Sequence, residues 1–166
     1  MNPTLTLTSD TLTPDLKRKL AAVSGSALAR VWHSAGTQLL SITRSAFRGA
    51  GNRQQAWPNK RDGSPSRLIG KGTLLASVRI VSADATGVTL GSDRPYARIH
   101  QLGGTITAKG GGALRFFSGG KWWTVKSVKI PARPFLPFTP EGDVHPKFRV
   151  RVGNLIEKAV GLALKT

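Results

Sequence analysis

Aromatic and basic side chains gather over residues 113–126, where the sequence reads ALRFFSGGKWWTVK. Two alternating runs flank the turn residues 118–120, a combination typical of a β-hairpin. Aromatic rings beside cations can stack the bases of a single strand while the cations contact its phosphates. Adjacent strand residues point to opposite faces, so we expect one ring of each aromatic pair to face the core. The hairpin is therefore a candidate surface for nucleic acid or another partner.

A second basic segment lies at residues 49–72, which we predict to be a long loop whose one acid is Asp62. A structureless stretch of this length in a small domain is usually functional or disordered. We interpret it as a basic loop that orders on a partner, and a solvated loop is the alternative. The candidate DNA- or partner-facing cations of the loop and the hairpin are Arg53, Lys60, Arg61, Arg67, Lys71, Arg115, Lys121 and Lys126.

The charge of the whole chain points the same way. Its 166 residues contain 25 Lys and Arg against 8 Asp and Glu, which gives a net charge of +17. A compact domain with this balance attracts polyanions, so the expected partner is nucleic acid or an acidic protein surface in an assembly. A solvated basic surface without a partner is the alternative, although +17 exceeds what solubility requires. Because the cations are spread along the chain, they favour sequence-neutral phosphate contact over base recognition.

Groups that could carry out catalysis or hold a metal are sparse. The chain has no cysteine, which excludes disulfides, thiol catalysis and Cys-based metal sites. His33, His100 and His145 lie far apart in sequence, and the eight acids offer no convincing acid–base pair. The glycines at 110–112 lack the pattern of a phosphate-binding loop, so we interpret them as a flexible hairpin tip. We therefore expect no enzymatic activity, no metal and no cofactor.

The length predicts one domain built around one hydrophobic core. No run reaches 18 apolar residues, so no membrane-spanning helix is expected. The first residues lack a basic segment followed by an apolar one, so no signal peptide is expected either.

An α+β fold must position these segments. We predict an antiparallel β-sheet packed by one long N-terminal helix and one C-terminal helix, with a long β-hairpin. A short strand over 3–8 alternates Thr and Leu and suits a sheet edge because of its proline. A helix over 14–48 has apolar residues at gaps of three or four, including Trp32 as a core residue. Gly25 and Gly36 weaken its interior by about 1 kcal/mol each, so the pattern allows a kink or break.

Residues 74–130 change to a period of two, which predicts the antiparallel sheet and hairpin. Strands are expected over 77–81 and 87–91, and the second hairpin arm is expected to continue to Ile130. Residues 96–102 have the spacing of a short helix.

In the segment 131–143, prolines recur at every third position from Pro131 to Pro140, so we expect no regular secondary structure there. Apolar residues lie between these prolines, which predicts a buried connector. A second amphipathic helix is expected over 146–164.

Three segments together carry a family resemblance. Residues 68–78 read LIGKGTLLASV, residues 88–92 and 96–104 read VTLGS and YARIHQLGG, and residues 130–136 read IPARPFL. They resemble the motifs L-x-x-T-G-x-L-x-x-S-I, v-x-i-G-(S/T)…Y-A-x-I-H-Q-x-G and I-P-A-R-P-F-L of the phage virion morphogenesis (tail completion) family of Mu-like and related tailed phages. Trp57-Pro58 stands where that family often has a Trp-Pro pair.

The resemblance implies a structural protein of the head–tail connector or neck, which completes the tail and joins it to the head as an oligomeric ring. The implied partners are further copies of the chain, with a hexamer favoured, then tail-tube, neck or connector proteins, and packaged DNA. It implies a place at the head–tail junction of the virion, reached from the host cytoplasm during assembly, with no membrane involved. From the residues alone, a sequence-neutral nucleic-acid-binding protein that uses the basic surface and hairpin aromatics remains the alternative.

The family motifs also imply a set of packed structural residues. Arg133 lies between two prolines, and burial of its guanidinium requires an acid or a carbonyl as partner. The implied structural positions are Gly72, Leu74, Ser77, Gly91, Tyr96, Ala97, His100, Gln101, Gly103, Pro131, Ala132, Arg133, Pro134, Phe135 and Leu136.

Overall fold

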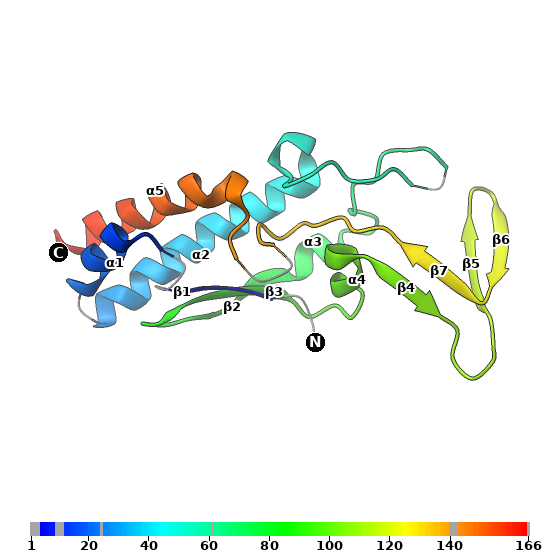
Figure 1. Cartoon of the computed structure of the whole chain (residues 1–166), viewed down its shortest axis with the longest axis horizontal. Coiled ribbons are helices and arrows are strands. Elements are labelled where there is room, and N and C mark those ends of the chain that lie inside the picture. The colour runs from blue at the N-terminus through cyan, green and yellow to red at the C-terminus, as the bar shows by residue number, and fades with distance from the viewer. Residues whose placement is uncertain (1–3, 9–11, 24, 61, 140–142, 166) are drawn as a thin grey trace.

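The computed structural model describes residues 4–8, 12–23, 25–60, 62–139 and 143–165. It is an α+β fold with antiparallel sheets, which confirms the predicted class (Figure 1). In chain order the elements are β1 (Thr4–Thr8), α1 (Pro14–Ala21), α2 (Gly25–Arg48), η2 (Ala50–Asn52), α3 (Thr73–Ser77), β2 (Val78–Ala83), β3 (Gly87–Ser92), α4 (Ala97–Leu102), β4 (Gly104–Thr107), β5 (Leu114–Ser118), β6 (Lys121–Val125), β7 (Ser127–Ile130) and α5 (Pro146–Ala163).

A three-stranded antiparallel sheet forms one layer of the body, in the order β1-β3-β2. The N-terminal strand β1 lies at the sheet edge, as its proline-preceded sequence predicts. The central strand β3 pairs Leu90 with Leu5 on one side and with Ile80 on the other. A register shift follows Ile80 in β2, and Val81 there is exposed.

Helix α2 lies across this sheet, and α5 lies on the far side of α2 (Figure 1). Gly36 of α2 faces the sheet so closely that a Cβ atom there would lie 2.6 Å from Val88 Cγ2. This glycine lets the backbone of α2 approach the sheet. It does not interrupt the helix, which continues to Arg48.

The predicted helix over 14–48 is instead two helices, because the chain leaves helical structure after Ala21 and resumes it at Gly25. The break allows α1 to pack separately against α5, where Lys19 Nζ lies 2.6 Å from Glu157 Oε1. Glycine at the start of α2 makes continuation of α1 less favourable.

Two groups of buried apolar residues stabilise the body. One joins α1, α2, the three-stranded sheet and α5, and includes the fully buried Trp32, as predicted. The other surrounds the C-terminal end of α2 at Phe47, together with Trp57, Phe135 and Leu136. The second group is the part of the core that positions the candidate site.

Residues 104–130 project from the body, and we call them the arm (Figure 1). Its stem is the antiparallel pair β4–β7, and its far end is the hairpin β5–β6. No residue of the arm is fully buried. The arm therefore lacks a hydrophobic core of its own.

The arm differs from the predicted hairpin, whose second strand was expected to continue to Ile130. That strand is interrupted at Lys126, so that β6 pairs with β5 whereas β7 pairs with β4. Gly110 and Gly111 have φ of +61° and +73° and turn the chain between β4 and β5. These glycines are thus not the hairpin tip, which lies at Ser118 to Lys121.

Among the described helices, none combines the length and the hydropathy needed to cross a membrane.

Candidate functional site

Residues 133–138 of the proline-rich connector are buried, as predicted, and a glutamine side chain satisfies two of their backbone N–H groups; residues 140–142 of the predicted connector lie outside the described residues. Oε1 of Gln101 accepts hydrogen bonds from Phe135 N at 2.9 Å and Leu136 N at 3.0 Å. Phe135, Leu136 and Gln101 are all at most 3 % exposed. A proline-rich segment cannot form the regular backbone hydrogen bonds of a strand or helix. The side chain of Gln101 therefore supplies the acceptor that two buried backbone N–H groups need.

The tryptophan of the long loop is held against the same connector. Trp57 Nε1 donates to Pro134 O at 3.0 Å, and its ring meets Phe47 edge-on at 5.9 Å. The guanidinium of Arg53 lies 3.9 Å from the centre of the Trp57 ring, and its Nε donates to Ala46 O. Burial, followed by the charge of Arg67, lowers the pKa of Arg53.

Arg53 was predicted to face DNA or a partner, and that role stays a prediction. Its guanidinium is half-buried and bound within the protein, so it stabilises the loop. The sequence does not reveal these internal contacts, because an arginine four residues before a tryptophan is equally compatible with an exposed binding pair.

Arg133 holds the loop to the connector through two carbonyl groups. It is only 8 % exposed, and it donates from Nε to Pro58 O and from Nη2 to Asn59 O, both at 2.9 Å. Carbonyls were one of the two partners expected for it. Its backbone N also donates to His100 O at 2.7 Å, which ties the connector to α4. Burial lowers the pKa of Arg133.

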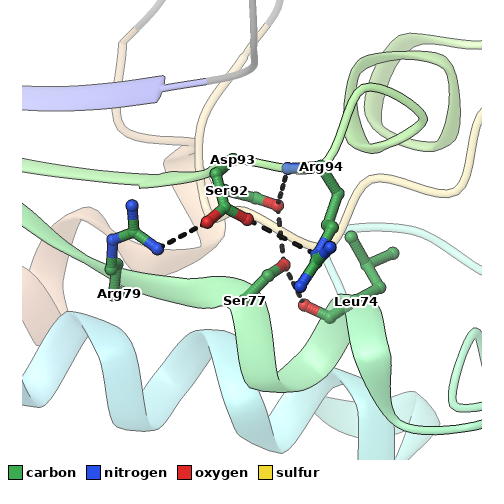
Figure 2. Close-up of polar contacts among 6 residues, drawn as sticks. All are labelled: Leu74, Ser77, Arg79, Ser92, Asp93 and Arg94. Atoms are coloured by element: carbon green, nitrogen blue, oxygen red, sulfur yellow. Dashed lines mark hydrogen bonds and ion pairs between the residues drawn. The ribbon is translucent and has the colours of Figure 1, made fainter.

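A pair of serines fixes the start of β2 against the end of β3 (Figure 2). The hydroxyl of Ser77 donates to Leu74 O at 2.7 Å and lies 2.7 Å from the hydroxyl of Ser92. Ser92 Oγ in turn accepts from Arg94 N at 3.2 Å. Both hydroxyls are buried, and these bonds position the turn that leads into α4.

Asp93 adds an ion pair on the outside of this turn (Figure 2). Its carboxylate lies 2.7 Å from Arg79 Nη1 and 3.5 Å from Arg94 Nε. The hydrogen bond from Arg79 lowers the pKa of Asp93. The turn before α4 is therefore held from both its buried and its exposed side.

These anchored segments border an open hollow of about 710 Å³, which we call the basic cavity. It brings together the segment at 68–74, Tyr96 and His100 of the second motif and Arg133 of the third. Its described lining residues are Lys60, Pro65, Ser66, Arg67, Leu68, Ile69, Gly70, Lys71, Thr73, Leu74, Tyr96, His100 and Arg133. The three sequence segments that carry the family resemblance therefore meet at one place.

His100 contributes an unusual group to this cavity. Its Nδ1 atom is buried and has no hydrogen-bond partner in the described structure. Its ring lies 6.0 Å from the ring of Tyr96 in an edge-on arrangement. Burial, followed by the charge of Arg133, lowers the pKa of His100. The sequence marked His100 only as a motif residue and gave no sign of this cavity.

The arm provides a second, separate surface. Phe117 and Trp122 face each other across the strands, with ring centres 5.6 Å apart, and they are 61 % and 62 % exposed. The guanidinium of Arg115 lies 5.1 Å from the centre of the Trp122 ring. Arg115, Phe117 and Trp122 thus share one open face, as the pairing register requires.

The opposite face of the hairpin carries Phe116 and Trp123, which are partly buried. Trp123 Nε1 donates to Ser118 O at 2.9 Å, and Lys121 Nζ lies 4.3 Å from the centre of the Trp123 ring. One ring of each pair is therefore more buried than the other, as expected. These rings pair within the arm, at the register Phe116↔Trp123, and neither belongs to the two groups of core residues.

The other predicted cations separate into two sets. Lys60, Arg67 and Lys71 line the basic cavity. Lys121 lies on the arm with Arg115, and the exposed Lys126 occupies the interruption between β6 and β7. Arg61 lies outside the described residues.

Several glycines and small residues of the family motifs are required by the local backbone conformation or by close packing. Gly103 has φ of +74°, and a Cβ atom there would lie 2.8 Å from the backbone N of Ala132, next to Pro131. Gly72 has φ of +78° and precedes α3. Ala97 is fully buried, and Gly91 pairs with Thr4 and Arg79 inside the sheet.

Comparison with known proteins adds one match. A model of the phage virion morphogenesis family matches residues 10–158 of the 166. Neither the curated proteins nor the solved structures contain a significant match. Within the described residues, no group of three or more His, Asp or Glu lies close enough to hold a metal ion.

Proposed function

The chain belongs to the phage virion morphogenesis family, and we propose that it is a structural protein of the head–tail connector or neck. In this role it completes the tail and joins it to the head as an oligomeric ring, with six copies as the expected number. It acts at the head–tail junction of the virion, by contact with neighbouring components and without a catalytic step. A narrower assignment to Mu-like phages stays a prediction.

The arm is the observation that carries this proposal. It projects from the body and exposes Phe117 and Trp122 at its far end (Figure 1). Paired exposed aromatics are typical of protein contact surfaces, where such rings supply much of the binding energy. In a ring, the arm of each subunit would lie on its neighbour and bury this pair.

The charge distribution is consistent with a ring around DNA. The arm carries five cations and no acid, and residues 94–140 as a whole contain no Asp or Glu. A lumen lined by such cations would attract the phosphates of packaged DNA.

Light scattering on the purified chain tests the ring. We expect a mass of about six times 17.7 kDa for the wild type. The double variant Phe117→Ser/Trp122→Ser should give a monomer and should not complete tails in a phage complementation assay. Val81→Ser/Val150→Ser, which changes two exposed apolar residues of the body, is the matched control and should form the ring.

A wild-type chain that stays monomeric, alone and with isolated tails, would contradict the proposal. So would particles that join heads to tails normally when the chain is absent.

A second candidate function is sequence-neutral binding of single-stranded nucleic acid. The observation that favours it is the open face that Arg115, Phe117 and Trp122 share, because stacking needs an exposed ring and a nearby cation. Trp122 is the residue to test, since Trp123 lies on the more buried face and donates to Ser118 O.

Filter binding of an oligothymidylate over a salt series separates the two functions. If nucleic acid is the physiological ligand, affinity falls steeply with salt and Trp122→Ala weakens binding at physiological salt. Trp32→Phe in the core serves as the control for general damage to the fold. Weak binding at physiological salt, with ring formation intact, would favour the structural role.

A further inference from the structure

The basic cavity concentrates positive charge, and its described lining contains no carboxylate. Lys60, Arg67, Lys71 and Arg133 line it, and no Asp or Glu is among its described lining residues. The ion pairs found in the described ranges involve other cations, at Arg18, Lys19, Arg79 and Arg94. A cavity of this composition favours an anion over water.

Arg133 is the member of this set that most needs an anion. It is 92 % buried, and its hydrogen bonds go to two carbonyl oxygens, which carry only partial charge. A buried cation without a full counter-charge is costly, and an anion beside it offsets that cost.

His100 supplies an independent observation. Three buried side-chain atoms of the described structure lack a hydrogen-bond partner, and of these only His100 Nδ1 belongs to the lining of this cavity. Buried polar atoms are nearly always paired, so an unpaired one in a cavity wall indicates a partner that arrives from outside.

The cavity wall also has an unusual backbone. Leu68 has φ of +53° and is the one non-glycine residue with positive φ among those described. Gly70 and Gly72, beside it in the wall, have φ of +43° and +78°. Positive φ is unstrained for the two glycines, but the strained backbone of Leu68 is of the kind that clusters at binding sites, where the surrounding structure maintains it.

We propose that the basic cavity binds a short acidic segment of a partner protein, with carboxylates beside an apolar residue. The cations would pair with the carboxylates, and Pro65, Ile69 and Leu74 provide apolar lining for the neighbouring side chain. This apolar lining beside the cations favours a peptide over a nucleic-acid backbone, which offers phosphates without an apolar side chain next to them. This inference does not depend on ring formation by the arm.

Fluorescence anisotropy with labelled peptides tests the proposal at about 150 mM salt, where long-range attraction is screened. The probe is the acetylated peptide ELDFEL, and its amide counterpart QLNFQL is the matched control. A labelled oligothymidylate of twelve nucleotides is the third ligand. We expect ELDFEL to bind at least about tenfold more tightly than QLNFQL.

Two charge-reversal variants locate the binding. Arg67→Glu/Lys71→Glu changes two exposed cations of the cavity, and Lys121→Glu/Lys126→Glu makes the same change in charge on the arm. The first should weaken ELDFEL binding by about tenfold or more, whereas the second should leave it within about twofold. Circular dichroism melts confirm that both variants fold.

The imidazole of His100 gives a readout inside the cavity. A bound carboxylate favours the imidazolium, so NMR titration should find a higher pKa for His100 with ELDFEL than with QLNFQL. Equal binding of the two peptides, equal losses in the two variants, or an unchanged His100 would overturn the proposal. Binding of the oligothymidylate through Arg67 and Lys71, without binding of ELDFEL, would overturn it in favour of a nucleic-acid site.

Discussion

The body and the arm are stabilised in different ways. In the body, two groups of buried side chains lie between helices and a sheet, and the acids that form ion pairs are all there. In the arm, no residue is buried, no acid is present, and the strands are held by ladder hydrogen bonds and contacts between paired side chains. Two-stranded ribbons are marginal by themselves in water. The stability of the arm therefore depends on its attachment to the body and on the surfaces that it contacts.

The largest difference should appear between two phenylalanines. Phe135→Ala in the buried connector should lower the free energy of unfolding by about 3–5 kcal/mol, because it leaves a cavity between Phe47 and Leu136. Phe117→Ala on the arm should lower it by less than about 1 kcal/mol, since only a cross-strand contact is lost. Urea denaturation measures both. Equal losses would mean that the arm and the body share one core.

The second-largest loss of stability is expected where Gln101 of α4 binds the connector, close to the attachment of the arm to the body. Gln101→Met removes the oxygen that accepts from Phe135 N and Leu136 N, and leaves both donors buried. We expect a loss of about 2–4 kcal/mol in unfolding free energy, with faster amide exchange at these two positions. Gln55→Met, at an exposed position of the loop, is the control. Unchanged exchange at 135 and 136 would contradict the role given to Gln101.

Glycine substitutions in α2 and α5 test how closely each helix packs within the body. Gly36→Ala places a methyl group 2.6 Å from Val88 Cγ2, and should destabilise by about 1–3 kcal/mol. Gly161→Ala in α5 meets nothing within 4 Å, so it should stabilise by about 0.5–1 kcal/mol through helix propensity. Thermal melts of the pair should therefore move in opposite directions. Similar shifts in both would show that α2 does not lie close to the sheet.

The smallest predicted effect is a pH dependence at the basic cavity. The pKa of His100 is lowered from 6.5 by burial and then by Arg133, so below pH 6.5 the unfolded chain binds more protons than the folded one. Stability should be highest above pH 6.5 and should decline as the pH falls from 6.5 to the lower pKa of the folded state. His100→Asn should abolish this decline, whereas His33→Asn, at an exposed position, should retain it. Denaturation at pH 5 to 8 measures the difference.

The periodic parts of the fold could be predicted from the sequence. Apolar spacing located α2 and α5, alternation located β2, β3 and the hairpin, and the prolines of 131–137 indicated a buried connector. These features are local, because each depends on residues a few positions apart.

The parts that could not be predicted depend on distant pairs. The stem pairs Gly104 with Ile130, and no local pattern gives that register or the interruption at Lys126. The basic cavity likewise needs three segments to meet, and Arg53 looks like any loop cation until Trp57 is placed beside it.

The stem joins the far end of the arm to the wall of the cavity. Its strand β4 follows the α4 segment of His100, and its strand β7 leads into the connector of Arg133, while Arg133 N bonds to His100 O. Both strands of the stem therefore run directly into the segments that carry His100 and Arg133, and the bond between these two residues closes the ribbon at its base.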